Sequence, residues 1–142
     1  MHLFLSILLS ILFFTLSGVH VYWGLGGKWA LADAFPTKED GASQSKVPGK
    51  MATFLVAVGL FAFGIFYLIK SDILTISLPT FLLSYGYWII TLIFFLRAVG
   101  DFKYFGIFKK IRTTDFGKKD TRIYTPLCLC IGFSTLYLIV CF

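Results

Sequence analysis

The side chains that could do chemistry in this sequence are few, and they stand at the ends of long apolar stretches. His20 lies near the end of the first stretch, Arg97 and Asp101 follow the third, and Asp120 and Arg122 precede the fourth. Because ionisable groups at membrane depth are costly and often functional, we expect these residues to form one polar cluster. The predicted ligand-binding residues are His20, Trp23, Arg97, Asp101, Tyr104, Asp120, Arg122 and Tyr124.

The chemistry available to such a cluster is recognition of a polar head group. Arginine and aspartate side chains that meet in a dry setting form strong, often bidentate hydrogen bonds. An imidazole beside them, here His20, can carry a proton or hold the polar end of a ligand. The leading hypothesis is therefore a non-enzymatic protein that binds a lipid headgroup or another small amphiphile. The alternative structural interpretation is an ion-pair belt that ties a loop to the helix ends.

Two further functions stay open. A membrane-embedded enzyme acting on a lipid-soluble substrate would use His20 with Asp101 or Asp120 as its acid–base groups. Its catalytic residues and any cofactor are unknown. The second alternative function is that of a small transporter assembled as a homo-oligomer, a dimer in the simplest case. The transporter hypothesis is weakened because the middle of each apolar stretch contains no Asp or Glu.

Several kinds of redox, metal and hydrolytic site are excluded by residue spacing. Cys128 and Cys130 are two positions apart, so on a helix they point to nearly opposite faces and form no C-x-x-C motif. His2 and His20 belong to opposite ends of one stretch, which does not suit a bis-histidine haem. The sequence has no metal-binding set of ligands, phosphate-binding glycine loop or Ser-His-Asp pattern, and we predict no metal.

The elements that must position these residues are membrane-spanning helices. The chain has 142 residues, of which 58% are hydrophobic and only 14% charged. A soluble domain of this size could not bury so much apolar surface. Runs of about 20 apolar residues predict spanning helices, and four stretches qualify, at 3–27, 51–69, 73–96 and 123–142. We therefore predict an all-α integral membrane protein, one domain over 1–142, that forms a four-helix transmembrane bundle.

Charge predicts the orientation of the bundle. All of the 13 Lys and Arg residues except Lys70 lie in the loops 28–50 and 97–122. The positive-inside rule places these loops in the cytoplasm and both termini outside, in a multi-pass protein of the cell membrane. The expected partners are the lipid bilayer and anionic lipid headgroups. The net charge of +6 follows from this topology, and no motif supports binding to nucleic acid.

Residue patterns also predict packing faces and one surface segment. Small and polar residues at helical spacing mark the faces that pack together in lipid. Between spans three and four, Phe102–Arg112 alternates aromatic and basic residues at a spacing close to three, which predicts a basic amphipathic cytoplasmic helix. The predicted packing faces are Ser6, Ser10, Ser17, His20 and Gly24; Ala52, Gly59 and Ala62; Ser77, Thr80, Ser84, Trp88 and Thr91; and Thr125, Cys128, Gly132 and Thr135.

Three runs of sequence carry a resemblance to a known family. They are Gly18–Trp29, Arg97–Tyr104 and Asp120–Cys128. With the four-span layout they resemble a family of small bacterial membrane proteins catalogued as domain of unknown function 3995. The family pattern has Arg where this chain has Lys103, a change that keeps the charge and loses bidentate geometry. The resemblance implies no activity, but it implies that six cluster residues belong to the pattern: His20, Trp23, Arg97, Asp101, Arg122 and Tyr124.

Overall fold

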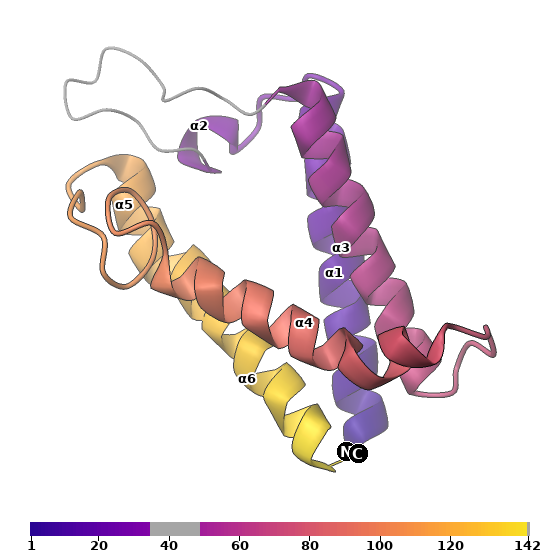
Figure 1. The fold of residues 1–142 in the computed structure, drawn as a ribbon. Helices are drawn as coiled ribbons and strands as arrows, with labels where there is room; N and C mark the ends of the chain where they lie inside the picture. The colour runs from indigo at the N-terminus through magenta and orange to yellow at the C-terminus, as the bar shows by residue number, and fades with distance from the viewer. Residues whose placement is uncertain (35–48, 142) are drawn as a thin grey trace.

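The computed structural model describes residues 1–34 and 49–141, and over these residues the secondary structure is entirely helical (Figure 1). Four helical runs are long and apolar enough to cross a membrane: α1, α3, α4, and the continuous run from α5 to α6. The predicted all-α fold with four spans is confirmed. The helices are α1 (His2–Gly24), α2 (Leu31–Ala34), α3 (Lys50–Lys70), α4 (Thr80–Val99), α5 (Asp115–Lys119), the π-helical turn η1 (Asp120–Tyr124) and α6 (Thr125–Cys141).

The helix bounds differ most from the predicted spans at two places. The third helix begins at Thr80 and not at Ile73, because Pro79 disfavours helical backbone in the residue before it. The fourth run begins well before position 123. Its first turn starts at Asp115, where the Thr114 hydroxyl accepts a hydrogen bond from an amide of the turn. Most of the predicted loop 28–50, and the last residue of the predicted fourth span, lie outside the described residues.

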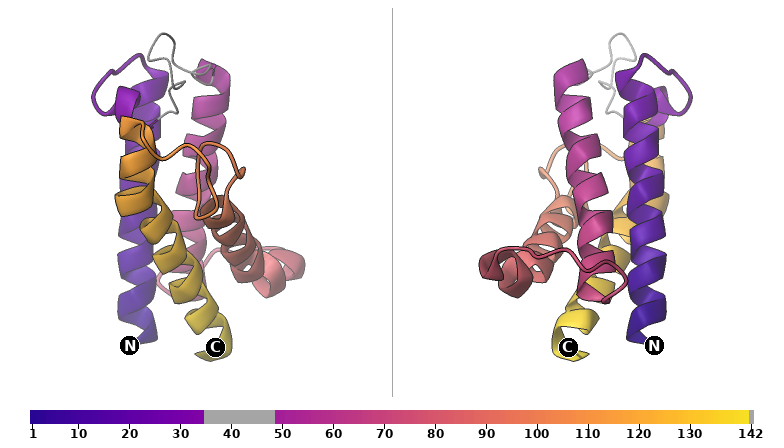
Figure 2. Two further views of the ribbon diagram at one scale, coloured as in Figure 1. Left: turned by 90° about the vertical axis from the view of Figure 1, so that its left-hand side faces the viewer. Right: turned by 90° about the vertical axis from the view of Figure 1, so that its right-hand side faces the viewer.

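The four long helices are arranged as two antiparallel hairpins (Figures 1 and 2). In the first hairpin α1 packs along α3, and in the second α4 packs along α6. Two serine hydroxyls join the first hairpin: Ser10 Oγ donates to the carbonyl oxygen of Gly64 at 2.9 Å, and Ser17 Oγ donates to that of Ala57 at 2.7 Å. Interhelical hydrogen bonds of this kind are a main source of helix association in lipid.

The hairpins meet near the chain termini, at what we call the terminal end (Figure 1). The fully buried ring of Phe13 on α1 packs against Tyr67 of α3 and Phe94 of α4, with ring centroids 5.5 Å apart in both pairs. Thr135 of α6 donates its hydroxyl to a carbonyl of its own helix, so it accepts from the hydroxyl of Tyr67, at 2.6 Å. At the opposite end, the loop end, the described part of the chain brings the short α2 against α5.

We expect Tyr67→Phe to lower the stability of this junction by about 1 kcal/mol, because it removes one buried interhelical hydrogen bond. The measurement is the melting temperature in mild detergent. The control is Tyr85→Phe, which removes a hydroxyl from an exposed side chain of α4. If both variants melt at the same temperature, the hydrogen bond to Thr135 does not hold the hairpins together.

The predicted packing faces are confirmed for the first and last spans and wrong for the middle two. Most of the first set and all of the last set are buried, although His20 is only partly buried. Of the five residues predicted for the third span, four are exposed and only Thr91 is buried, because α4 makes its contacts through large rings and not through hydroxyls. The residues that α3 and α4 bury are Thr53, Ala57, Leu60, Gly64, Phe66, Tyr67 and Ile69, and Gly86, Tyr87, Ile90, Thr91, Phe94 and Ala98.

Residues 102–112 do not form the predicted amphipathic helix. The segment turns back onto the end of α4, where the amide of Ile107 donates to the carbonyl oxygen of Ala98 at 2.8 Å. Gly100 and Gly106 adopt φ values of 85° and 94°. Residues other than glycine rarely adopt a backbone conformation in this region. A Cβ at Gly100 would overlap the carbonyl oxygen of Phe105. The close approach of these two glycines therefore replaces helical hydrogen bonding.

Candidate functional site

The centre of the loop end is one buried carboxylate, that of Asp120, whose side chain has no exposed surface. One carboxylate oxygen is 3.0 Å from Arg97 Nη2. The other accepts from Lys109 Nζ at 2.7 Å, from the amide of Gly106 at 2.9 Å and from the hydroxyl of Thr125 at 3.1 Å. Two cations thus share one anion, so this cluster carries a net charge of +1. Four donors satisfy the buried carboxylate, as a charge in a dry site requires.

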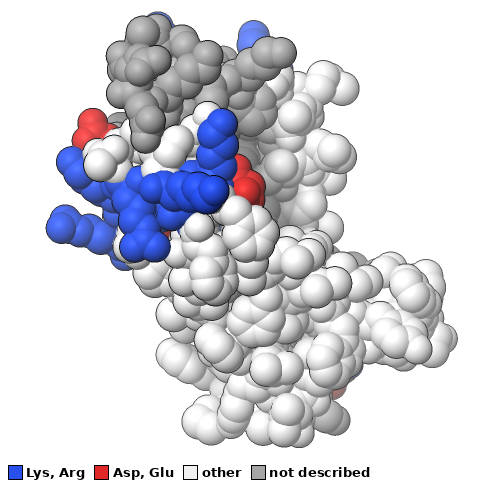
Figure 3. Space-filling model, turned by 60° about the vertical axis from the view of Figure 1, so that its left-hand side comes forward, with Lys and Arg blue, Asp and Glu red and all other residues white. Residues whose placement is uncertain are grey.

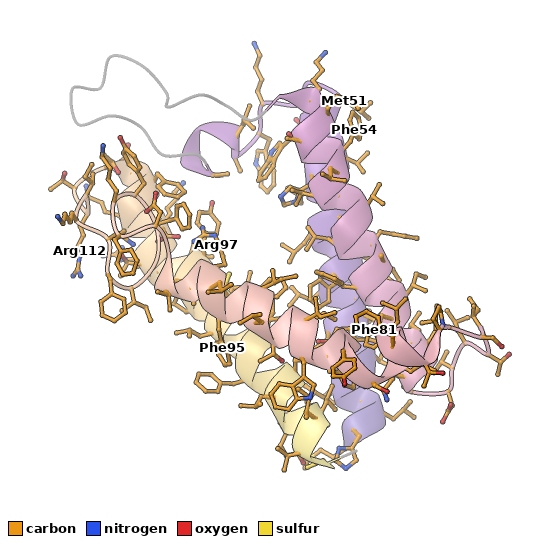
Figure 4. All side chains as sticks on the ribbon, in the orientation of Figure 1. Met51, Phe54, Phe81, Phe95, Arg97 and Arg112 are labelled. Atoms are coloured by element: carbon orange, nitrogen blue, oxygen red, sulfur yellow. The ribbon has the colours of Figure 1, made fainter. Side chains whose placement is uncertain are left out.

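Arg97 connects this cluster to the space between the hairpins. It stands in the last turn of α4 (Figure 4), and its guanidinium carbon lies 4.4 Å from the centre of the Phe105 ring. Nη2 is bound to Asp120, whereas Nη1 is buried and has no hydrogen-bond partner among the described residues. A buried donor left unpaired is unfavourable by about 1–3 kcal/mol. Nη1 is therefore a donor that an acceptor on a ligand would satisfy.

A cleft of about 470 Å³ separates the two hairpins beside Arg97. Its polar residues come from the loop-end turns of their helices: His20 and Trp23 from α1, Arg97 from α4, and Tyr124 from η1. Apolar side chains make up the other walls, so the cleft has one polar end and one apolar body. The remaining lining residues are Leu16, Val19, Ala34, Val56, Gly59, Leu60, Phe63, Ile93, Phe94, Leu127, Cys128 and Ile131.

His20 has a defined tautomer in this cleft. Its Nδ1 lies 2.8 Å from the carbonyl oxygen of Leu16. Because a carbonyl oxygen only accepts hydrogen bonds, Nδ1 carries the proton, and Nε2 of the neutral ring is an acceptor. The ring also packs edge-on against Trp23, with centroids 5.1 Å apart, and Trp23 donates its indole N–H to the carbonyl oxygen of Trp29 at 2.8 Å. These contacts fix the orientation of both rings.

Three of the predicted site residues lie away from the cleft. Asp101 Oδ1 accepts from the backbone amides of Lys103, Tyr104 and Phe105 at 2.7–3.1 Å. Partial desolvation opposes the charge of Asp101, but these amides outweigh it and hold the pKa of the carboxyl below its usual range. Tyr104 packs against the ammonium group of Lys103, and Arg122 is exposed. The structure therefore places four of the predicted residues around the cleft, namely His20, Trp23, Arg97 and Tyr124. Asp120 does not line the cleft but binds the guanidinium of Arg97.

Lys109 and Gly106 take part in the site, and the sequence analysis did not select them. Lys109 is only 3% exposed, whereas its neighbour Lys110 is exposed. No sequence pattern distinguishes these two adjacent lysines. Gly106 did interrupt the aromatic and basic spacing of its segment, and this interruption was a signal of a backbone turn.

The surface around the loop end is strongly basic. Lys and Arg side chains gather over residues 103–122, whereas the visible surface below them is almost free of charge (Figure 3). The abrupt change from basic to uncharged surface is typical of a protein that meets the membrane–water interface at this level. The exposed cations there include Lys103, Lys110, Arg112, Lys118 and Arg122.

Four apolar spanning helices with a charged cluster at one end define a multi-pass membrane protein. The family described as protein of unknown function (DUF3995) matches residues 13–135, a range that includes the cluster and the cleft. The chain therefore belongs to this family, as its resemblance had implied. No curated protein and no solved structure matches the chain.

Proposed function

We propose that this protein binds an amphiphile with an acidic head group in the cleft between its two hairpins. The observation that carries the proposal is the combination of apolar walls with Arg97, His20, Trp23 and Tyr124 at one end of a cleft of about 470 Å³. That volume lies within the range of about 300–1,000 Å³ that small-ligand sites occupy. The ligand lies with its head at the loop end and its apolar part among the helices.

Electrostatics favour an acidic head group. The cluster holds two cations, Arg97 and Lys109, and one anion, Asp120, so an acidic group brings the site to neutrality. Arg97 supplies an N–H donor, Nη1, that has no partner in the described part of the chain, and guanidinium groups bind carboxylates and phosphates well. The exposed basic surface above the cleft attracts anionic headgroups at about 1 kcal/mol for each cation near the membrane.

The orientation belongs to this proposal. With the basic loops in the cytoplasm, the cleft faces the cytoplasmic leaflet of a bacterial cell membrane and takes its ligand from there. The enzyme and transporter hypotheses stay predictions. The carboxylate oxygens of Asp101 and Asp120 already accept from other donors, and no observation favours either hypothesis over binding.

The experiment is mass spectrometry of the amphiphiles that remain bound after purification in mild uncharged detergent. We expect the wild-type protein to retain an acidic amphiphile. Arg97→Lys keeps a cation opposite Asp120 but removes the Nη1 donor, and we expect it to retain about tenfold less. The matched control is Lys118→Gln, which removes one exposed positive charge and should retain as much as wild type.

Size-exclusion chromatography shows that each variant is folded before its ligand content is compared. Absence of any acidic amphiphile from folded wild-type protein would contradict the proposal. An equal loss of bound acidic amphiphile in Arg97→Lys and in Lys118→Gln would also contradict the proposal, because that result assigns binding to surface charge and not to the cleft.

A further inference from the structure

We infer that the ligand of the cleft is of the lysolipid class, with one apolar chain and a head group that combines an acidic oxygen with a neighbouring hydroxyl. This inference rests on the proposed function and specifies its ligand. Three features of the cleft carry it: the hydrogen-bonding polarity of Arg97 and His20, which both line its polar end, the volume of the cleft and its position between the hairpins.

The polar end of the cleft offers one donor and one acceptor. Among the described residues Arg97 Nη1 is a buried N–H group without a partner, so it requires an acceptor such as a phosphate or carboxylate oxygen. In the neutral ring His20 Nε2 is an acceptor, because the contact of Nδ1 with the Leu16 carbonyl oxygen assigns the proton to Nδ1. A fully ionised head group without a hydroxyl would satisfy Arg97 and would place a second acceptor against His20. A head group with an acidic oxygen and a hydroxyl satisfies both residues.

The volume of the cleft favours a single chain. About 470 Å³ is in the lower half of the range for small-ligand sites, and a lipid with two long chains is much larger than such ligands. Phe63, Phe94 and Ile131 line the apolar body of the cleft, and Phe94 also packs against Phe13 in the core. The core therefore limits how deep an apolar tail can extend.

The position of the polar groups also fits one compact head group. His20 and Trp23 belong to the first hairpin, and Arg97 and Tyr124 belong to the second. A head group that contacts His20 and Arg97 together bridges the hairpins at the loop end, where α2 lies against α5. Its hydroxyl and its acidic oxygen therefore bind different hairpins.

The test measures quenching of Trp23 fluorescence by ligands with brominated chains. The reporter protein carries Trp29→Phe and Trp88→Phe, since these two exposed tryptophans lie outside the polar end of the cleft. A second protein that keeps only Trp88 reports partition into the bilayer. The protein is placed in nanodiscs of phosphatidylcholine at pH 8. The probes are lysophosphatidylglycerol, phosphatidylglycerol and a fatty acid of the same chain length.

We expect saturable quenching of Trp23 by lysophosphatidylglycerol, with affinity about tenfold higher than for either other probe. His20→Ala should remove the preference of the site for lysophosphatidylglycerol over the fatty acid, and size-exclusion chromatography shows that this variant is folded. Soluble glycerol 3-phosphate should not compete, because it lacks the chain.

The outcomes separate this inference from the proposed function. If phosphatidylglycerol quenches Trp23 with the same affinity as lysophosphatidylglycerol, the lysolipid class is wrong and the amphiphile site stands. The same conclusion follows if His20→Ala still prefers lysophosphatidylglycerol over the fatty acid. Competition by glycerol 3-phosphate overturns the requirement for a chain. If none of the three acidic amphiphiles quenches Trp23 more than it quenches Trp88, both the inference and the proposed function fail.

Discussion

Asp120→Ala is expected to destabilise the protein by about 3–5 kcal/mol, the largest effect that we predict for one side chain. The substitution leaves the ammonium group of Lys109 buried without its anion, and it also frees the guanidinium of Arg97. Breaking a buried pair is more harmful than removing both partners, because the surviving charge has no compensation. The measurement is the melting temperature in mild detergent, together with the yield of monodisperse protein.

Two companion variants make this result specific. Asp115→Asn changes an exposed carboxylate in the first turn of the same helical run, and it should melt within a degree or so of wild type because exposed charges contribute little. Asp120→Ala combined with Lys109→Met removes the uncompensated cation, so the double variant should melt above Asp120→Ala alone. If Asp120→Ala melts like Asp115→Asn, the buried carboxylate does not organise the loop end.

Gly100→Ala is expected to destabilise the loop end by about 3 kcal/mol or more, through the backbone alone. Gly100 has φ 85° and ψ −167°, a conformation that is essentially confined to glycine. The added methyl group would also overlap the carbonyl oxygen of Phe105. The expected result is a lower melting temperature, with faster amide hydrogen exchange in residues 101–112 as that segment separates from α4.

Gly18→Ala is the matched control for this backbone effect. Gly18 is exposed on α1, and a Cβ there would meet nothing within 4 Å. The substitution should be neutral or slightly stabilising, because alanine is the better helix former. Faster exchange confined to residues 101–112 is the expected pattern for Gly100→Ala. Exchange equal to that of Gly18→Ala would contradict the role of Gly100.

The spans could be predicted from the sequence because bilayer thickness sets a length that apolar runs must match. The packing faces could be predicted only where helices meet through small residues, as at Ser10 and Ser17 on α1. On α4 the contact is made by Tyr87 and Phe94, and aromatic residues are so frequent in this chain that their spacing identifies no particular face.

The partners within the charged cluster could be predicted only in part. The sequence placed Arg97 and Asp120 at one depth, and the structure pairs them. It placed Asp101 at that depth as well, but this carboxylate binds local amides, a contact that depends on the turn after Gly100. The turn itself was missed because the spacing of residues 102–112 matched a helix, whereas contacts distant in sequence determine their backbone.

The contact between the two hairpins has a consequence for the cleft. The hairpins are joined where Phe94 of α4 packs against Phe13 of α1, and where Tyr67 of α3 binds Thr135 of α6. Phe94 also lines the cleft and stands three residues before Arg97 on α4. A shift of one hairpin against the other would therefore displace a wall of the cleft together with the Arg97 side chain, which couples the fit between the hairpins to the shape of the ligand site.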